Sequence, residues 1–241
     1  KRLFEGAEIK GFRTFKEAYS AAVKGEVDYA LLPIENTLTE ALTGTIDLII
    51  QGDLKIVGST KTQVEHALLA LPGVKLNEIK QVLSHPIALA QCTQFLNEHQ
   101  FLEAVNFYDT AGAAEEVANQ NDRTMSAIAN REAGKIYGLE VIVDSIQDHV
   151  ENFTRFVLLS KRETKGKNCA LVFVTEHKPG ALAEVLNFLA KNEMNLTQIV
   201  SRPIVGKPFE YQFYIEIENA KPALKDLKVH SLKILGCYDN I

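Results

Sequence analysis

One short segment of the chain combines an arginine and a threonine at the start of an apolar run. It consists of Asn152, Phe153, Thr154, Arg155 and Phe156, and apolar residues follow it directly. Arg155 offers a planar fork of donors that suits a carboxylate, whereas Thr154 offers a hydroxyl that donates or accepts without carrying charge. Open α/β sheets place ligand-binding residues at the mouths of buried strands, so the segment predicts a carboxylate site. The structural alternative is a strand-favouring threonine beside a surface arginine.

Two further segments place small polar groups where the chain changes direction. Asn36 and Thr37 follow an apolar run, and Asn36 either bonds its own backbone in a turn or belongs to a loop that binds a small anion. Ser84 and His85 precede Pro86, which fits the first turn of a helix. Free amides at a helix start favour an anionic ligand or an interdomain contact. A lone histidine such as His85 is more often a structural group than a catalyst.

Thr110 also has either a binding role or a purely structural one. It is predicted to cap a helix over residues 111–119 and is followed by small residues. Close helix packing is the alternative to a binding role. None of these segments supplies metal ligands, a glycine-rich phosphate loop or a Ser-His-Asp set. Together they predict a pocket for a small carboxylate, with little covalent chemistry.

The elements that position these residues alternate between apolar runs and amphipathic stretches, which indicates mostly parallel sheets with helices on both faces. Helices are predicted over residues 15–24, ended by a glycine, and then from residue 86 onward, over 111–119 and over 130–137. Strands are predicted over residues 27–34, 81–83, 101–107, 125–129 and 139–143.

A charged, aperiodic stretch over residues 161–167 marks the domain boundary. Beyond it, strands are predicted over residues 170–175, 196–201, 211–218 and 232–238, with helices over 180–191 and 222–227. This β-α-β-β-α-β order is the split, ferredoxin-like arrangement. The sequence therefore predicts an α/β domain over residues 1–163, followed by a small ferredoxin-like domain over residues 168–241.

Composition excludes several classes of protein. The 241 residues carry a formal net charge of −5 and no run of Lys and Arg, so neither nucleic acid nor an anionic membrane is expected as a partner. No apolar run reaches the ~20 residues that a membrane helix needs. We interpret the widely spaced Cys92, Cys169 and Cys237 as reduced, buried thiols of a cytoplasmic protein.

In order and spacing, the polar segments and their flanks resemble prephenate dehydratases. The first domain carries the resemblance in Pro33-Ile34-Glu35-Asn36-Thr37, Ser84-His85-Pro86, Ala88-Leu89-Ala90-Gln91-Cys92, Asp109-Thr110-Ala111 and Asn152-Phe153-Thr154-Arg155-Phe156. The second domain resembles the ACT domain of that family in Pro179-Gly180-Ala181-Leu182, Asn195-Leu196-Thr197, Ser201-Arg202-Pro203 and Tyr211-Gln212-Phe213-Tyr214. The resemblance covers nearly the whole chain, and this collinear set is far more specific than any single motif.

The resemblance implies a periplasmic-binding-protein-like catalytic domain, with two α/β lobes and the active site between them. It also implies conversion of prephenate to phenylpyruvate with loss of carbon dioxide and water, without a metal or cofactor because aromatisation drives the reaction. Thr154 would assist departure of the ring hydroxyl, and Arg155 would clamp a carboxylate. The substrate pocket would be completed by Asn36, Thr37, Ser84, His85, Thr110, Asn152 and Phe156. The alternatives are an arogenate dehydratase and a non-catalytic sensor of an amino acid or carboxylate.

The resemblance to an ACT domain implies feedback binding of L-phenylalanine and a homodimer or homotetramer formed through these domains. The expected effector residues are Pro179, Gly180, Ala181, Leu182, Asn195, Leu196, Ser201 and Arg202. The helix that starts at Gly180 would hold the carboxylate of the amino acid on its free amides, unless the glycine merely permits the turn.

Four features depart from the family pattern. The chain begins after the strand and glycine turn with which the family opens, so part of the first lobe is expected to be missing. The family usually has a small residue, often glycine, a few positions after the asparagine, where this chain reads Leu38-Thr39-Glu40-Ala41 and Gly44 and Thr45 follow only later. Ile87 replaces a common glutamine, and Val200 stands where glutamate is usual, which bears on the effector site.

Overall fold

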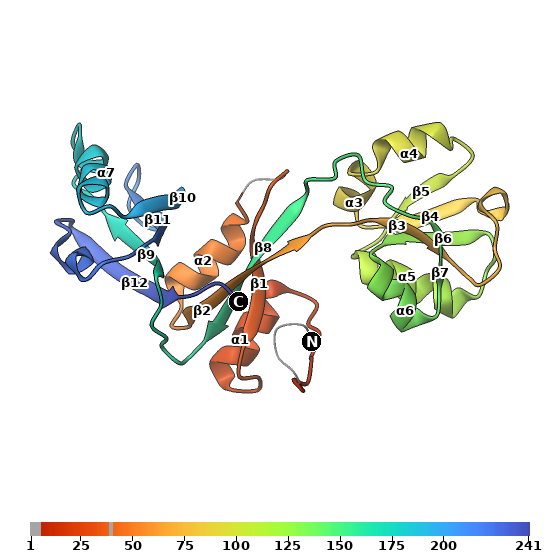
Figure 1. The fold of residues 1–241 in the computed structure, drawn as a ribbon, viewed down its shortest axis with the longest axis horizontal. Helices are drawn as coiled ribbons and strands as arrows, with labels where there is room; N and C mark the ends of the chain where they lie inside the picture. Colours follow the sequence, from red (N-terminus) through yellow and green to blue (C-terminus); the bar gives the residue numbers. More distant parts are fainter. Residues whose placement is uncertain (1–5, 39–40) are drawn as a thin grey trace. The chain divides into compact units, whose positions relative to one another are not determined.

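The computed structural model describes residues 6–38 and 41–241, so Thr39 and Glu40 of the departing stretch lie outside the described residues. The chain divides into two compact units (Figure 1). Residues 63–153 form one unit, which we call the second lobe. The other unit combines the chain up to residue 62 with the chain from residue 154 onward. It contains a first lobe and a carboxyl-terminal module over residues 168–241.

The first lobe is built on a three-stranded sheet in the order β1 (Ala30–Asn36), β8 (Phe153–Ser160) and β2 (Lys55–Gln63). Its helices are α1 (Phe15–Lys24) and α2 (Thr43–Gln51). Thr14 and Glu17 form a capping box at the start of α1, and Gly25 ends this helix with a φ of 79°. The predicted first helix is therefore confirmed, together with the glycine that ends it.

The second lobe contains a five-stranded sheet with helices on it. Its strands lie in the order β5 (Glu103–Asn106), β4 (Gln81–Ser84), β6 (Met125–Ala129), β3 (Ala67–Ala70) and β7 (Glu140–Val143). Its helices are the short 3₁₀ helix η1 (Leu76–Glu78), α3 (Pro86–Ala90), α4 (Thr93–Glu98), α5 (Thr110–Gln120) and α6 (Arg131–Tyr137). β4 runs parallel to β5 and β6, whereas β3 is antiparallel to β6 and β7. The prediction of mostly parallel sheets is wrong for β3, which lies between β6 and β7 and runs opposite to both. It is also wrong for the first lobe, where β1 and β8 are antiparallel.

The carboxyl-terminal module is a four-stranded antiparallel sheet with α7 (Ala181–Lys191) on one face (Figure 1). Its strands lie in the order β10 (Asn195–Pro203), β11 (Tyr211–Glu218), β9 (Asn168–Val174) and β12 (Ser231–Tyr238). This order confirms the predicted ferredoxin-like arrangement, except that the second helix, η2 (Pro222–Asp226), is a 3₁₀ helix.

The other face of the module sheet packs directly on the first lobe. Val172 and Tyr214 of the module share one buried cluster with Ile34, Ile46 and Ile49 of the lobe. Because burial of apolar surface is the main stabilising contribution to folding, the first lobe and the module form one structural body with a common core.

The helix predicted after Pro86 is interrupted. It forms two short helices, α3 and α4, because the Asp148 carboxylate accepts hydrogen bonds from the N–H groups of Thr93 and Gln94 at 3.0 and 2.9 Å. A side chain distant in sequence thus satisfies the amides of a new helix start. Nothing in the local pattern indicates this contact.

The N-cap of α5 is Asp109 rather than Thr110. The Asp109 carboxylate accepts from the N–H of Gly112, and Thr110 is the first helical residue. A carboxylate is also favoured by the positive end of the helix dipole, so it outcompetes the neighbouring hydroxyl for this position.

The interpretation of all three cysteines as reduced thiols is wrong for two of them. Cys169 and Cys237 lie directly opposite each other on β9 and β12 and form a disulfide. Cys92 is a free, fully buried thiol, as predicted. Burial and the nearby Asp148 raise the pKa of Cys92 to about 12, so this thiol is not poised as a nucleophile.

Candidate functional site

The antiparallel pair β1–β8 brings two of the predicted site residues together. Asn36 pairs with Thr154 in the register of the two strands, although 118 positions separate them. The Asn36 Nδ2 donates a hydrogen bond to the Thr154 Oγ1 at 3.0 Å, and the Asn36 Oδ1 accepts from the N–H of Leu38 at 3.0 Å. The turn contact expected of Asn36 is therefore present, and its amide nitrogen also contacts Thr154. With Oγ1 occupied as an acceptor, the hydroxyl proton of Thr154 is directed to another partner.

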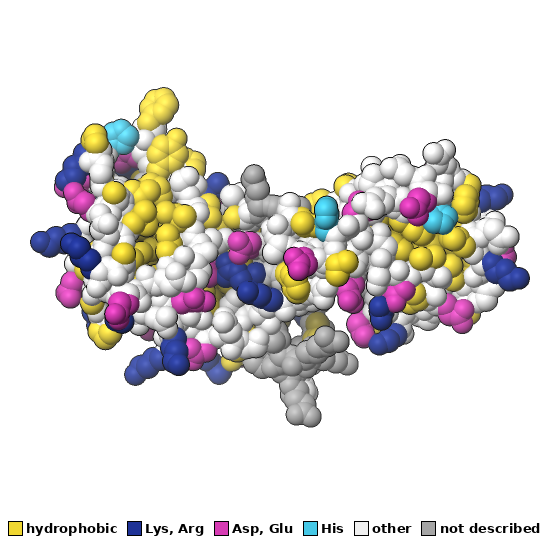
Figure 2. Space-filling view, turned by 45° about the horizontal axis from the view of Figure 1, so that its top comes forward, with side chains coloured by type: hydrophobic (Ala, Val, Ile, Leu, Met, Phe, Trp, Pro, Cys, Tyr) yellow, Lys and Arg dark blue, Asp and Glu magenta, His cyan; other side chains and the backbone are white. Residues whose placement is uncertain are grey.

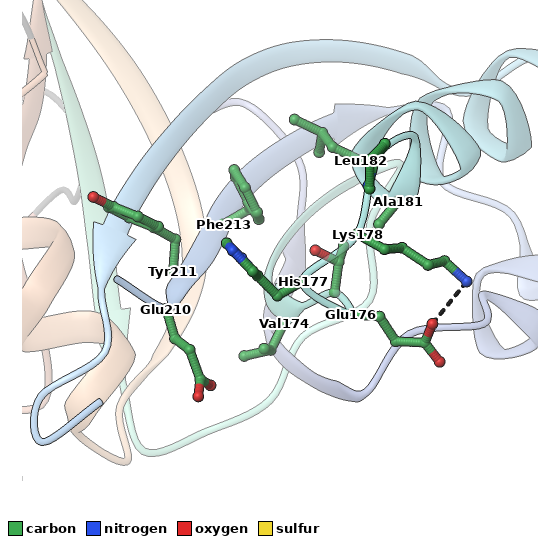
Figure 3. A pocket seen from close by; sticks show the side chains of 11 residues that line it. Val174, Glu176, His177, Lys178, Ala181, Leu182, Glu210, Tyr211 and Phe213 are labelled. Carbon is green, nitrogen blue, oxygen red and sulfur yellow. Dashed lines mark ion pairs between the residues drawn. The ribbon is translucent and has the colours of Figure 1, made fainter. Parts of the chain in front are cut away.

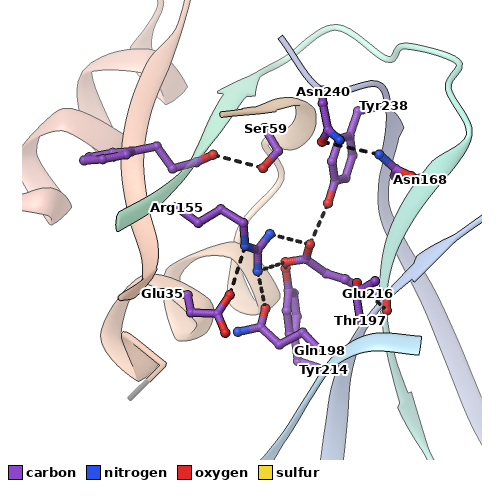
Figure 4. Close-up of polar contacts among 11 residues, drawn as sticks. Glu35, Ser59, Arg155, Asn168, Thr197, Gln198, Tyr214, Glu216, Tyr238 and Asn240 are labelled. Carbon is purple, nitrogen blue, oxygen red and sulfur yellow. Dashed lines mark hydrogen bonds and ion pairs between the residues drawn. The ribbon is translucent and has the colours of Figure 1, made fainter. Parts of the chain in front are cut away.

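Arg155 lies in the neighbouring register position, opposite Glu35. Its Nε donates to the Glu35 Oε2 at 3.0 Å, and its Nη1 and Nη2 donate to the two Glu216 oxygens at 2.6 and 3.1 Å (Figure 4). Nη2 also donates to the Gln198 Oε1 at 2.7 Å. Burial favours the neutral form of this guanidinium, but the Glu216 carboxylate outweighs that effect and raises the pKa of Arg155. In this structure the donors predicted for a substrate carboxylate bind carboxylates of the chain itself.

In the second lobe, the carboxyl ends of the parallel strands β4, β5 and β6 lead into helix starts. Ser84 is fully buried, and its hydroxyl donates to the Ile128 carbonyl at 2.6 Å. His85 is the N-cap of α3 and accepts from the N–H of Ile87 through Nδ1 at 3.2 Å. Thr110 begins α5 and is partly buried. The three predicted residues thus lie at the carboxyl edge of one sheet.

The remaining predicted substrate residues lie on or beside the paired strands. Asn152 is fully buried, and its carbonyl accepts from the N–H of Val64 at 2.7 Å. Phe156 lies on β8, where its carbonyl accepts from the Ser59 hydroxyl at 3.2 Å. Thr37 directly follows β1 and is exposed.

A cavity of about 430 Å³ lies in the carboxyl-terminal module, where three predicted effector residues line it. Pro179, Ala181 and Leu182 form one wall at the start of α7, and Tyr211 and Phe213 of β11 form an aromatic wall (Figure 3). Gly180 precedes α7 with a φ of 84°, a left-handed conformation that side chains with a Cβ disfavour. The cavity therefore joins apolar and aromatic surface to the amides of a helix start.

Polar side chains also line this cavity. Glu176 and Lys178 form an ion pair of 2.7 Å, and His177 lies between them in the sequence (Figure 3). The ion pair lowers the pKa of Glu176 and raises that of Lys178, so both groups are charged at neutral pH. The cavity offers the mixture of apolar surface and opposite charges that a zwitterionic amino acid requires.

The other four predicted effector residues do not line this cavity in the protomer. Asn195 donates to Glu218, and Leu196 packs in the core of the module. Ser201 is exposed on β10, and Arg202 binds Asp47 of α2, with 2.7 Å between Nε and Oδ1. Val200, next to them, packs against the core that the module shares with the first lobe.

Sequence reasoning missed Glu35 and Glu216 as partners of Arg155, and it missed Tyr214 and Tyr238, which donate to Glu216 at 2.6 and 2.7 Å. A signal existed for one of them. Glu216 interrupts the apolar strand β11 and is only 4% exposed. A charge in a buried strand needs a paired partner, so its presence predicts an ion pair without naming Arg155.

Neither a metal centre nor a membrane-crossing helix is found within the part of the chain that the structure describes. Residues 6–38 and 41–241 contain no group of three or more His, Cys, Asp or Glu side chains that could hold a metal ion. The helices formed by these residues are too short or too polar to cross a membrane.

Comparison with known proteins gives two family matches that follow each other along the chain. Residues 1–164 match the family model described as prephenate dehydratase, and residues 170–230 match that of the ACT domain. The chain is 37% identical to arogenate dehydratase/prephenate dehydratase 2 of Arabidopsis thaliana over 261 residues, which cover 99% of this chain and 68% of the relative. It spans about two thirds of the length of the curated relatives it matches.

Several solved structures share the fold, and two of them illustrate it. A prephenate dehydratase of Arthrobacter aurescens in complex with L-Phe matches with a TM-score of 0.82 and 29% identity, covering 93% of this chain and 79% of that one. A structure described as GqqA, a novel type of quorum quenching acylase, matches with a TM-score of 0.88 and 29% identity, covering 98% and 91%.

Proposed function

Since the chain belongs to the prephenate dehydratase family and carries an ACT domain, we propose that it converts prephenate to phenylpyruvate and is regulated by L-phenylalanine. The observation that carries this proposal is the Asn36–Thr154 hydrogen bond, which lies within the matched range and joins two of the motif segments. Two segments that were identified by their order in the sequence are thus also in contact in the structure, which supports the assignment to this family's reaction.

The reaction needs one bond to break at each end of the ring. The carboxylate leaves as carbon dioxide, the electrons of its C–C bond enter the ring, and the ring hydroxyl departs as hydroxide, which takes a proton from solvent to become water. Formation of the aromatic ring drives both losses, so the protein must orient the dianion and assist the leaving hydroxide. A poorly solvated environment for the departing carboxylate favours its loss.

Thr154 is the residue that we assign to the leaving hydroxyl. Its Oγ1 already accepts from Asn36, which leaves the hydroxyl proton available for the departing oxygen. The pKa of an alcohol is too high for full proton transfer, so Thr154 acts by hydrogen bonding as negative charge develops on the leaving group. Thr37, Ser84, His85, Thr110, Asn152 and Phe156 stay predicted substrate contacts. For Ser84, whose hydroxyl proton is committed to Ile128, the contact would have to use a lone pair or its backbone.

We assign the effector to the cavity at the start of α7. The phenyl ring of L-phenylalanine would contact Tyr211, Phe213 and Leu182, and its carboxylate would lie at the amides that follow Gly180. The support from a relative is the Arthrobacter aurescens structure, which contains L-Phe.

We also propose a homo-oligomer formed through the ACT domains. β10 and β12 are the edge strands of the module sheet, and Leu186, Val205 and Phe209 of the module are exposed apolar side chains. Figure 2 shows apolar side chains gathered over the module, at the left. In a homo-oligomer, the edge strands of two copies would pair, and the exposed apolar side chains would be buried between them. A cytoplasmic location stays a prediction, and the Cys169–Cys237 disulfide removes part of its basis.

The test is phenylpyruvate formation by the purified protein from prephenate, with and without L-phenylalanine. Arogenate is assayed in parallel, because a preference for it would identify the arogenate dehydratase alternative. Hydrolysis of an N-acyl amide is the third assay, since a protein of the same fold is described as an acylase. Turnover of neither ring substrate by the folded protein would reject the proposal and favour the sensor.

A further inference from the structure

Thr154 and Arg155 are successive residues of β8, and their side chains lie on opposite faces of the first-lobe sheet. Thr154 pairs with Asn36, and Arg155 pairs with Glu35 on the same antiparallel ladder. Side chains of successive strand residues point to opposite faces of a sheet. The Thr154 hydroxyl therefore lies on one face, and the Arg155 guanidinium lies on the other, against the ACT domain, with a single peptide bond between the two residues.

The Arg155 guanidinium is held by the ACT domain on two sides. Glu216 of β11 binds it through both carboxylate oxygens, and Gln198 of β10 accepts from Nη2 at 2.7 Å. Glu35 of the first lobe completes the set through Nε. The Arg155 side chain is 15% exposed, so these contacts are shielded from water and fix its rotamer.

Glu216 is itself fully satisfied. Besides Arg155, its oxygens accept hydrogen bonds from the Tyr214 hydroxyl at 2.6 Å and the Tyr238 hydroxyl at 2.7 Å (Figure 4). Burial and the Glu216 charge raise the pKa of both tyrosines, so both remain donors over the working pH range. Residues of three ACT-domain strands thus hold Arg155, those of β10 and β11 by direct hydrogen bonds and Tyr238 of β12 through Glu216.

Stability does not account for this arrangement. Well-packed apolar side chains commonly stabilise such a junction as well as a buried ion pair does, because burial of two charges costs desolvation. The apolar core of Ile34, Ile46 and Val172 already joins the two parts around it. A saturated ion pair gives something that an apolar contact does not, a single orientation for the residue next to Thr154.

We propose that Glu216 of the ACT domain is a positioning residue for the reaction, which acts through Arg155 to hold β8 in place at Thr154. This inference rests on the proposed function, in which the Thr154 hydroxyl assists the leaving group. It makes the ACT domain part of the support of the active site and not only the carrier of an effector cavity.

The experiment compares kcat and KM for prephenate in the full chain and in single variants. Glu216→Gln keeps the size of the side chain but removes its charge, and we expect kcat to fall by about tenfold with little change in KM, since a small misplacement of a catalytic group is costly. Lys233→Met is the matched control. Lys233 is another ACT residue that reaches the first lobe, at the Ile50 and Gly52 carbonyls, and its loss should leave kcat unchanged.

A double variant separates positioning from a general loss of structure. In the Thr154→Ala background, Glu216→Gln should cause no further loss of kcat, because the group that it positions is already absent. If Glu216→Gln fails to fold, Tyr238→Phe removes one hydrogen bond from the carboxylate and keeps the ion pair, and it should lower kcat by a smaller factor.

Three outcomes would overturn the inference: wild-type kcat in the folded Glu216→Gln variant, an equal loss in Lys233→Met, or additive losses in the double variant. If the wild-type protein turns over neither prephenate nor arogenate, the proposed function fails and the inference fails with it. If the wild type is active and Glu216→Gln is equally active, only the inference fails.

Discussion

The Asn36 amide donates a hydrogen bond to the Thr154 hydroxyl across two antiparallel strands, with 3.0 Å between Nδ2 and Oγ1. The amide cannot accept the threonine proton through this nitrogen, so the pair has a fixed direction. The same asparagine is held by the N–H of Leu38, which keeps its oxygen occupied. The Thr154 oxygen therefore already accepts one hydrogen bond, and its hydroxyl proton can be donated to a substrate.

Removal of this hydroxyl should impair chemistry more than binding. We expect Thr154→Ala to lower kcat for prephenate by roughly 10²-fold or more, the usual range for assistance by a general acid. Thr154→Ser retains the hydroxyl and should recover most of the rate. Steady-state measurement of phenylpyruvate formation checks this, and an unchanged rate in folded Thr154→Ala would reject the assigned role.

A side chain at Gly180 should disrupt the effector cavity. Valine is strained at a φ of 84° and would displace the start of α7, so we expect Gly180→Val to abolish inhibition by L-phenylalanine. Gly206→Val is the matched control, because Gly206 has a φ of 82°, has open space around it and does not line the cavity. Inhibition is measured as the ratio of rates with and without effector. Equal inhibition of the two variants would place the effector site elsewhere.

Two ion pairs that join the ACT domain to the first lobe should differ in their contribution to stability. Glu216→Gln leaves the buried Arg155 without its main counter-charge, and we expect the free energy of unfolding to fall by about 3–5 kcal/mol. Asp47→Asn breaks the more exposed pair with Arg202 and should cost only about 0.2–1 kcal/mol. Urea unfolding of both variants measures the difference, and equal losses would contradict it.

His66 should make stability depend on pH. Its burial in the second lobe lowers its pKa below the ordinary value of 6.5, against the opposing effect of the hydrogen bond that it donates to the Gln91 Oε1. The unfolded chain therefore binds a proton at a higher pH than the folded chain does. Stability from this group is complete above pH 6.5 and is lost as pH falls below it towards the lowered pKa.

The test is urea unfolding between pH 7.5 and pH 5 for the wild type, His66→Gln and His149→Gln. His66→Gln should flatten the fall in stability across this range. His149 is exposed, so His149→Gln should retain the wild-type slope. A wild-type slope in His66→Gln would assign the dependence to other groups.

Local patterns in the sequence were sufficient for much of the fold. The helical spacing of the apolar residues before Gly25 and the apolar run of β11 predicted these elements closely, because their ends depend on residues within a few positions. By contrast, residues 38–80 contain α2, β2 and β3, to which sequence analysis assigned no element. α2 has neither an N-cap hydrogen bond from a side chain nor an acidic residue in its first turn, so its start carries no signal.

Prediction of the site from sequence is limited by contacts between residues that are far apart in the chain. The motif segments that hold Asn36 and Thr154 were identified, but their hydrogen bond follows from strand pairing that no local pattern reveals. Arg155 shows the same limit more sharply. Its residue type predicts a carboxylate partner, and the structure supplies one from Glu216, 61 positions later. Residue chemistry thus gave the class of partner, while the fold decided which one it was.

The division of the chain into units has a consequence for protein synthesis. The second lobe is a continuous stretch, so it can fold on the ribosome as soon as it has emerged. The first lobe cannot, since β1 must wait for β8, and its core also contains Leu235 and Tyr238 of β12. Its apolar surfaces therefore stay partly uncovered until β12 has been translated. The part that holds Thr154 therefore matures after the second lobe, and its nascent form benefits from protection by chaperones in the meantime.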